Sequence, residues 1–346
     1  MNGPRLPVLA VTMGDPVGIG PEIVARALAD PALAVVGRGL AVGDAVVLRR
    51  AARVCGLELE VNPVGSPGEA RYAPGTIDVL DLGVAGADLE WGVVNPLAGR
   101  SAVAAVQAAT QAALDGQVDA VVTAPINKEA IWASGSRHLG HTEMLADLTG
   151  APWSDTMFVV RGLKIFFTTR HMALRAALEQ VTEERVAASI RRAVVALRVF
   201  GHDHPRLAVA ALNPHGGENG NFGDEEITVL RPAVEKAIAE GLQVSGPVPA
   251  DSVFHQGLAG RYDGVLSHFH DQGHIASKTV DFDGTVSVTI GLPIVRTSVD
   301  HGTAFDIAGT GRASYATMSA AFRAGAEFSR FGERVRAAYG PPPAAS

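Results

Sequence analysis

The sequence predicts an α/β protein built on a largely parallel, doubly wound sheet. Short runs rich in aliphatic and β-branched residues alternate along the chain with longer, Ala-rich amphipathic runs. Strands separated by helices are typical of βαβ units, whose strands lie parallel in one sheet. At 346 residues the chain is long enough for about two domains, and no stretch has the composition of a linker. We therefore expect two α/β domains that share an extended sheet.

The first half of the chain supplies two clear strands and two helices. Residues 6–12 (LPVLAVT) predict a strand that leads through a Gly/Pro-rich turn into a helix from Pro21. Proline suits the first position of a helix because the N–H that it lacks has no partner there. Residues 101–116 predict a helix that ends at a glycine, and residues 118–124 predict the buried strand that follows.

The second half continues the alternation. Residues 163–169 predict a strand, and residues 182–201 predict a helix capped by Thr182, with two glutamates in the first turn, where the helix dipole favours anions. Further strands are expected at 206–212, 262–269 and 285–290, and a last helix over 315–340.

The amino-acid composition limits which partners we expect this protein to bind and in which compartment we expect it to work. Asp and Glu (36) outnumber Lys and Arg (29), and the net charge of −7 argues against nucleic acid or an anionic membrane as the main partner. Cys55 is the single cysteine, so an intrachain disulfide is excluded. The first residues show no long apolar run of a signal peptide, and no segment reaches the ~18 consecutive apolar residues of a membrane span. We expect a cytoplasmic protein.

Three histidines follow three of the predicted strands: His171 (KIFFTTRH), His215 (RLAVAALNPH) and His270 (GVLSHFH). In open α/β sheets ligands bind at the carboxyl ends of the strands. Three imidazoles at that edge could hold one divalent ion and leave positions open for a substrate. Each histidine alone would more often be a loop or cap residue. His268 faces the same side of its strand as His270, so it is either a second ligand or a buried neighbour.

Cationic and polar residues suggest an anion site. Lys278 and Arg296 flank a predicted strand, and both side chains suit a phosphate or carboxylate, although each alone would be interpreted as a solvated surface charge. His141 and Thr142 follow a glycine at a probable helix start, where Thr142 could equally be a cap. The glycine-rich turn MGDPVGIGPE (13–22) could hold an anion, but it matches neither the dinucleotide fingerprint nor a P-loop.

Taken together, seven segments closely resemble the 4-hydroxythreonine-4-phosphate dehydrogenase family of vitamin B6 synthesis. They occur in the family's order between about residues 7 and 335: GDPVGIGPE, TAPINKEA, GHTEML, NPHGGENGNFGDEE, GPVPADSVF, HDQGH and GLPIVRTSVDHGTAFDIAGTG. The loops that contain His215 and His270, with RTSVDHGTA, are highly specific, whereas the early glycine loop is not.

The resemblance implies an isocitrate/isopropylmalate dehydrogenase-like fold, with two doubly wound α/β domains and the active site in the cleft between them. Residues 1–130 and 285–340 would form the first domain. Residues 131–284 would form the second, which would carry most site residues and the interface of a homodimer. It also implies NAD or NADP as cofactor and a divalent metal (zinc, magnesium or cobalt). The metal would be held by His171, His215 and His270, with His270 supplied across the dimer interface.

The resemblance further implies a substrate. The expected reaction is oxidation with decarboxylation of 4-phosphohydroxy-L-threonine to 3-amino-2-oxopropyl phosphate, in pyridoxine 5'-phosphate biosynthesis. Ser287 stands where the family has Asn, and HDQGHI resembles a paralogous branch, so D-threonate or D-erythronate 4-phosphate in sugar-acid catabolism is the alternative. The substrate contacts carry over to this list: His141, Thr142, Lys278, Ser287 and Arg296.

Several roles stay open at the level of sequence. Asp251, Asp271 and Lys278 are candidates for the general base, His268 is expected to be a neighbour of the metal ligands, and His274 a loop residue. The residues that bind the cofactor are not identified. A metal-dependent phosphatase would also use three histidines and a phosphate site, and an acyltransferase of the phosphotransacetylase type would share the fold, so both remain rival functions.

Overall fold

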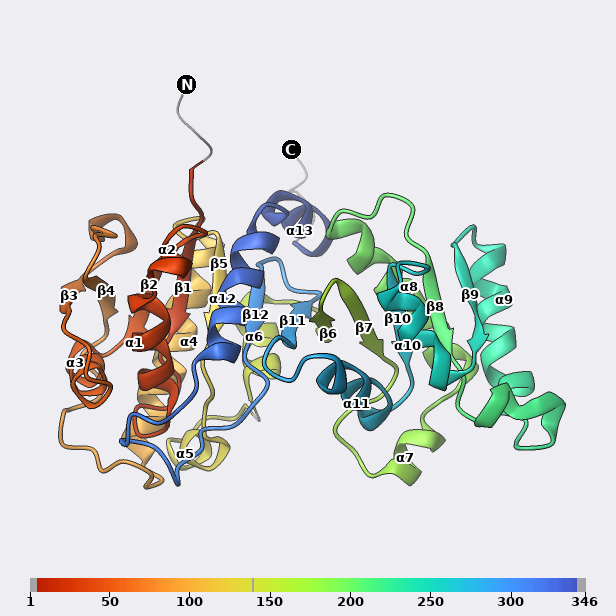
Figure 1. Cartoon of the computed structure of the whole chain (residues 1–346), viewed down its shortest axis with the longest axis horizontal. Helices are drawn as coiled ribbons and strands as arrows, with labels where there is room; N and C mark the ends of the chain where they lie inside the picture. Colours follow the sequence, from red (N-terminus) through yellow and green to blue (C-terminus); the bar gives the residue numbers. More distant parts are fainter. Residues whose placement is uncertain (1–4, 139, 341–346) are drawn as a thin grey trace. The chain divides into compact units, whose positions relative to one another are not determined.

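The computed structural model describes residues 5–138 and 140–340 and divides into two compact units (Figure 1). Unit 1 contains the described residues up to Asp155 and those from Val286 onward. Unit 2 is Thr156–Thr285. Residues 131–155 thus group with unit 1, whereas the sequence suggested a boundary at residue 130; the domain limits implied by the family resemblance stay a prediction.

Unit 1 is built on a sheet whose strands are buried and mostly parallel. The order is β3 (Glu60–Val64), β4 (Thr76–Asp81), β2 (Arg38–Gly43), β1 (Val8–Thr12), β5 (Ala120–Thr123), β12 (Arg296–Ser298) and β11 (Val286–Ile290). Only β11 and β12 pair antiparallel among these strands. The predicted strands at 6–12, 118–124 and 285–290 are confirmed as β1, β5 and β11.

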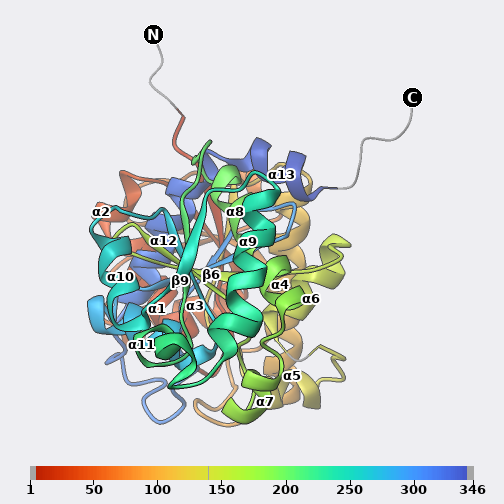
Figure 2. The same cartoon turned by 90° about the vertical axis from the view of Figure 1, so that its right-hand side faces the viewer.

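Helices cover both faces of this sheet, as the doubly wound pattern requires (Figure 2). The helices of unit 1 are α1 (Gly20–Ala29), α2 (Pro31–Ala34), α3 (Ala45–Val54), α4 (Pro96–Leu114), α5 (Lys128–Ala133), α6 (His141–Thr149), α12 (Ala316–Ser329) and α13 (Gly332–Tyr339), with a short turn η1 (Pro67–Glu69). α4 begins five residues before the predicted start, because Asn95 caps it by accepting a hydrogen bond from the Leu97 N–H at 2.7 Å.

The two helices α4 and α5 approach each other at a glycine. A Cβ atom on Gly99 would lie 2.0 Å from the Ala130 carbonyl oxygen, so only glycine permits this contact. Val106 and Ala109 of α4 pack with Val8 and Ala10 of β1 in the core of the unit. The abundance of Ala and Gly in the sequence therefore permits close packing of helices against the sheet.

The strands of unit 2 are again mostly parallel. The order is β6 (Asp155–Val160, whose first residue is the last of unit 1), β7 (Leu163–Phe167), β10 (Gly264–Ser267), β8 (Leu207–Ala210) and β9 (Val244–Val248). β6 and β7 form an antiparallel hairpin, and the pairs β7–β10, β10–β8 and β8–β9 are parallel. The predicted strand at 262–269 is shorter than expected because a helix begins at His270.

α8 and α9 cover one face of this sheet, and α10 and α11 the other (Figure 2). The helices of unit 2 are α7 (Leu174–Glu179), α8 (Glu183–Val199), α9 (Arg231–Ala239), α10 (Ala250–Leu258) and α11 (His270–Val280), with the short turns η2 (Pro214–Gly220) and η3 (Glu226–Leu230). Thr182 caps α8 as predicted, since its hydroxyl accepts from the Arg185 N–H at 3.3 Å. In the part of the chain that the structure describes, no helix is both long and apolar enough to span a bilayer.

Candidate active site

The three candidate metal ligands leave from three adjacent strands of unit 2. β10 pairs with β7 on one side and with β8 on the other. His171 follows β7, His270 opens α11 directly after β10, and His215 lies in η2 after β8. The sequence therefore placed all three correctly at one edge of one sheet.

The structure brings two of these histidines together. The rings of His171 and His270 have their centroids 5.4 Å apart. The side chain of His215 is 70% exposed and bonds Glu218 through Nδ1 at 3.1 Å. His215 also has a left-handed backbone, with φ at +53°. Over residues 5–138 and 140–340, no three His, Cys, Asp or Glu side chains converge closely enough to hold a metal.

His270 is oriented on two sides. Its Nδ1 lies 2.7 Å from Asp271 Oδ1, and its ring stacks on His274 with centroids 3.6 Å apart and planes 12° apart. The Asp271 contact fixes Nδ1 as the protonated nitrogen and leaves Nε2 as the atom able to bind an ion, as in many histidine metal ligands. His274 is not the loop residue expected from sequence: it lies inside α11, buried against Phe158 and Phe167, because the helix starts four residues earlier.

His268 is a buried residue with both ring nitrogens occupied. Its Nε2 lies 2.7 Å from the Ala210 carbonyl oxygen, and its Nδ1 lies 3.2 Å from Thr168 Oγ1. Burial lowers the pKa of His268 to about 4, so the ring is neutral at physiological pH. The sequence left His268 open between ligand and neighbour, and this geometry makes it a neighbour.

Glu226 is a structural residue of the site that sequence reasoning missed. It is buried, and one carboxylate oxygen accepts from the backbone N–H groups of Leu212 and Asn213 at 2.8 and 2.7 Å. The other accepts from Asn213 Nδ2 at 2.9 Å. Burial raises its pKa, but the hydrogen bonds from Asn213 and Leu212 outweigh burial and lower it. Glu226 thus holds the segment that leads to His215. Its position at the end of the loop GENGNFGDEE is the only signal in the sequence.

In unit 1 the buried Arg296 forms the centre of a candidate anion site. Nη1 donates to Thr289 Oγ1 at 2.9 Å and Nη2 to Thr123 Oγ1 at 2.5 Å. Nε has no partner among the described residues. Burial lowers the pKa of Arg296 to about 9, which leaves it charged at neutral pH. Arg296 is only 4% exposed, so a buried cation with an unused donor stands ready for an anion.

His141 and the start of α6 complete this anion site. His141 is the first residue of α6, and its buried Nε2 also lacks a partner in the described structure. Burial, and next the charge of Arg296, lower the pKa of His141 well below its usual value, so the ring is neutral. Gly140 precedes α6 and offers no side-chain cap, so the positive end of the helix dipole, with Thr142 in the first turn, suits an anion.

The remaining predicted residues lie on β11, α11 and α10. Ser287 is 9% exposed on β11, opposite Ser298 of β12. Lys278 lies in the last turn of α11, with its Nζ 5.0 Å from the centre of the Phe282 ring. Asp251 is exposed in the first turn of α10. Asp271 contacts His270, which favours a role in orienting that ring.

Asp15 is a second buried carboxylate that the sequence did not single out. It lies in the turn after β1, is fully buried, and accepts from the Val17 N–H through Oδ1 at 3.0 Å. Its Oδ2 has no partner in the described chain. Burial raises its pKa from 3.8 to about 6, in spite of hydrogen bonds from Val17 and Asn127. The turn GDP could have indicated it, but burial is a property of the fold.

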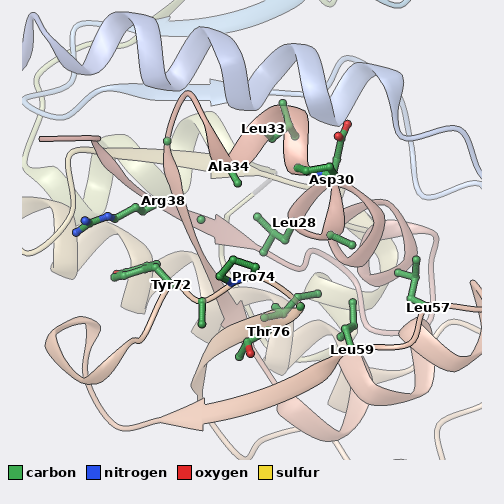
Figure 3. Close-up of a pocket in the computed structure, with 18 of the residues that line it drawn as sticks. Leu28, Asp30, Leu33, Ala34, Arg38, Leu57, Leu59, Tyr72, Pro74 and Thr76 are labelled. Atoms are coloured by element: carbon green, nitrogen blue, oxygen red, sulfur yellow. The ribbon is translucent and has the colours of Figure 1, made fainter. Parts of the chain in front are cut away.

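An apolar pocket of about 530 Å³ lies elsewhere in unit 1 (Figure 3). It is bounded by Leu28, Leu33 and Leu59 and by the amino-terminal ends of β2 and β4. None of the predicted site residues lines it. The anion site lies at the carboxyl end of β5 and at the start of α6. The pocket lies at the amino-terminal ends of β2 and β4, so the two are at opposite ends of the strands.

Comparison with known proteins identifies the family. The sequence profile described as "Pyridoxal phosphate biosynthetic protein PdxA" matches residues 36–325, most of the chain. The chain belongs to the PdxA family. It is therefore a PdxA-family NAD(P)-dependent dehydrogenase, and the resemblance stated from the motifs is confirmed.

Relatives of this PdxA-family chain carry two kinds of name. A Cutibacterium acnes protein, 57% identical over 98% of both chains, has D-threonate 4-phosphate dehydrogenase as a provisional name. So does a Symbiobacterium thermophilum protein, 52% identical over 95% of this chain and 99% of its own. A solved Klebsiella pneumoniae structure is named 4-hydroxythreonine-4-phosphate dehydrogenase; it is 42% identical over 95% of this chain and 99% of its own, with a TM-score of 0.87.

The predicted fold class is confirmed by these structures. A phosphotransacetylase from Staphylococcus aureus also matches 93% of this chain and 94% of its own, with a TM-score of 0.51 and 13% identity. At that identity it shares the fold alone, so it gives no support to an acyltransferase activity.

Proposed function

We propose that this PdxA-family dehydrogenase oxidises a four-carbon sugar-acid 4-phosphate, D-threonate 4-phosphate first and D-erythronate 4-phosphate second. The observation that carries the proposal is identity: the relatives named for D-threonate 4-phosphate are 57% and 52% identical, against 42% for the structure named for 4-hydroxythreonine 4-phosphate. The motifs alone favour 4-phosphohydroxy-L-threonine, with the sugar-acid phosphates as the alternative. Ser287, in place of the family's Asn, fits the revised order.

The proposed reaction is oxidation followed by loss of CO2. A base would take the proton of the 3-hydroxyl, and NAD(P)+, when bound, would supply the oxidant that accepts the C3 hydrogen as hydride and becomes NAD(P)H. The new C3 ketone is β to the carboxylate, so the C1–C2 bond breaks and CO2 leaves. The bonding pair forms an enediolate that takes a proton at C2, which gives dihydroxyacetone phosphate. The same steps on 4-phosphohydroxy-L-threonine give 3-amino-2-oxopropyl phosphate.

The phosphate would be bound by the anion site of unit 1. Arg296 offers its unused Nε–H, and the neutral His141 offers Nε2, which as the protonated tautomer donates a hydrogen bond. Thr142, in the first turn of α6, adds a donor at the positive end of a helix dipole. We assign Lys278 a further contact to the substrate. These groups fix the position of C3 relative to the cofactor.

A divalent metal would be held by His171, His215 and His270. Two imidazoles with centroids 5.4 Å apart can both reach one ion at a Zn–N distance of about 2 Å, so this pair fits the group. The contact from Asp271 to His270 matches the carboxylate support that such ligands receive. When bound, the ion would lower the pKa of the substrate's 3-hydroxyl and polarise the ketone. Imidazole ligands suit zinc or cobalt, while substrate oxygens would suit magnesium.

We also propose a homodimer, with α10 and α11 of unit 2 at its interface. A groove of about 520 Å³ runs between these helices, lined by Phe254, Leu258 and Ile275. Ile275 is 64% exposed and the nearby Phe282 65% exposed, which is unusual for large apolar side chains. α11 also begins at His270, so an interface along it would lie beside the candidate metal site.

The test is a spectrophotometric screen for NAD(P)+ reduction by the purified, metal-supplemented protein. The panel holds D-threonate 4-phosphate, D-erythronate 4-phosphate and 4-phosphohydroxy-L-threonine, each repeated after chelation and each assayed for inorganic phosphate. Chelator-sensitive reduction with D-threonate 4-phosphate as the best substrate supports the proposal. Preference for 4-phosphohydroxy-L-threonine would instead support that compound, which the motifs predict, as the substrate. Release of inorganic phosphate without formation of NAD(P)H would rule out both dehydrogenase functions and support the rival phosphatase function.

A further inference from the structure

His268 directly follows the middle one of the three strands whose ends carry the candidate metal ligands. β10 lies between β7 and β8, with Ser267 paired to Phe167 and Leu266 paired to Val209. His268 is the next residue after β10, and it is fully buried. Its ring therefore sits where it can reach both neighbouring strands.

The ring bonds to both of them. A carbonyl oxygen only accepts, so the 2.7 Å contact to Ala210 requires that Nε2 of His268 carries the hydrogen. In the neutral ring Nδ1 is then an acceptor, and the Thr168 hydroxyl donates to it at 3.2 Å. One side chain thus ties the end of β10 to the ends of β7 and β8.

Main-chain contacts of the same residue reinforce this tie. The carbonyl oxygen of His268 accepts from Thr169 N at 3.1 Å and from Thr169 Oγ1 at 2.7 Å. Its N–H donates to Gln272 Oε1 at 2.8 Å, and Gln272 Nε2 donates to the Ala211 carbonyl oxygen at 2.8 Å. Every one of these bonds joins two of the three strand ends or joins one to α11.

The ligands begin only a few residues beyond this tie. His270 is two residues after His268, His171 is three after Thr168, and His215 is five after Ala210. A metal site tolerates little error in ligand position, because ligand bonds of about 2 Å must all meet at one point. A relative shift of one strand end would therefore reach its ligand directly.

We propose that His268 is a positioning residue that sets the relative placement of the three ligand-bearing strand ends, and thereby the affinity of the metal, without binding the ion itself. The inference rests on the metal site of the proposed function. It predicts that the Ala210 bond matters more than the Thr168 bond, because it is shorter and because β8 leads into the longest ligand segment.

Three substitutions separate the two bonds. His268→Phe keeps an aromatic ring and removes both. His268→Gln places an amide near the position of Nε2 and keeps a donor for Ala210. His268→Asn places an amide near the position of Nδ1 and keeps an acceptor for Thr168. Val265→Ala is the matched control, since Val265 is buried on the same strand and has no polar side chain.

The experiment is titration of the metal-free full chain with Co²⁺, followed by visible absorption, with thermal unfolding of each variant in parallel. We expect His268→Phe to weaken Co²⁺ binding about 10-fold or more, the loss typical of residues that support metal ligands. His268→Gln should bind more tightly than His268→Asn, and Val265→Ala should lower the unfolding midpoint while its Co²⁺ affinity stays that of the wild type.

Several outcomes would overturn the inference. Wild-type affinity in His268→Phe, or in both amide variants if His268→Phe does not fold, would show that the tie does not position the ligands. An equal loss in Val265→Ala would reduce the effect to general destabilisation. Absence of Co²⁺ binding by the wild type would contradict the metal site, and with it the proposed function. The wild-type titration therefore distinguishes failure of the proposed function from failure of the inference about His268.

Discussion

The two candidate binding regions differ in how complete they are before a ligand arrives. In unit 1 Arg296 is 4% exposed and is held by two threonine hydroxyls, with donor atoms left over for an anion. In unit 2 His171 and His270 are adjacent, but His215 is 70% exposed on a loop of left-handed backbone. The anion site is thus preorganised, whereas the metal site must gain its third ligand by rearrangement or from a second chain.

The largest effect should come from breaking the preorganised site. Arg296→Met removes a buried cation and its charged hydrogen bonds, each worth about 1.5–3 kcal/mol, so kcat/KM for the phosphorylated substrate should fall by about 100-fold or more. Steady-state kinetics would measure it. Arg323→Met is the control, because Arg323 is exposed on α12 and bonds the Ala32 carbonyl oxygen at the surface of unit 1, so its kinetics should be unchanged. A small loss in Arg296→Met would contradict the anion site.

The metal region should respond differently in stability and in binding. His215→Ala should abolish tight Co²⁺ binding, a loss above the 10–100-fold typical of supporting residues, yet leave the unfolding midpoint unchanged because the side chain is exposed. Titration and thermal unfolding of the metal-free chain would measure both. His204→Ala, at an exposed histidine between α8 and β8, is the control. Unaltered Co²⁺ affinity in His215→Ala would remove His215 from the ligand set.

A third prediction uses pH to examine the buried carboxylate of unit 1. The folded state raises the pKa of Asp15 from 3.8 to about 6, so its contribution to stability is complete below pH 3.8 and is lost as pH rises to about 6. Asp15→Asn cannot ionise, so it should raise the free energy of unfolding at pH 7.5 by about 2–3 kcal/mol. Denaturant unfolding at pH 4 and pH 7.5 would measure it. An equal gain in the free energy of unfolding at both pH values would contradict the raised pKa of Asp15.

The smallest effect is expected at Ser287. Ser287→Asn offers an amide where the hydroxyl stands, and one hydrogen bond of about 1 kcal/mol should shift the ratio of kcat/KM between 4-phosphohydroxy-L-threonine and D-threonate 4-phosphate by roughly 5-fold. Competition of the two substrates would measure the ratio. No shift would mean that Ser287 does not contact the part of the substrate in which the two differ.

Local patterns in the sequence were enough for much of the fold. The alternation of residues 6–12 identified β1, and Thr182 with its acidic first turn identified the start of α8. The start of α4 was missed because Asn95 follows a segment without periodicity. The three histidines were found because strand ends are visible in sequence.

Burial was harder to foresee than position. Asp15, Glu226 and His274 are buried only because distant segments close over them, and neither composition nor spacing expresses that. The pairing of His171 with His270, and the exposure of His215, likewise depend on the paths of loops. The sequence therefore located the candidate ligands at the strand ends, and the structure shows which of them lie close together and which is exposed.

The loop of His215 has one more consequence, for adaptation to temperature. His215, Glu218 and Asn219 all have positive φ, at +53°, +44° and +57°, and each non-glycine residue there costs about 1 kcal/mol, somewhat less for Asn. Glycine at Glu218 or Asn219 would remove that cost, whereas His215 cannot change without loss of a candidate ligand. In PdxA-family proteins from hotter environments, we expect glycine at the third and fourth positions after the histidine, where Glu218 and Asn219 stand in this chain.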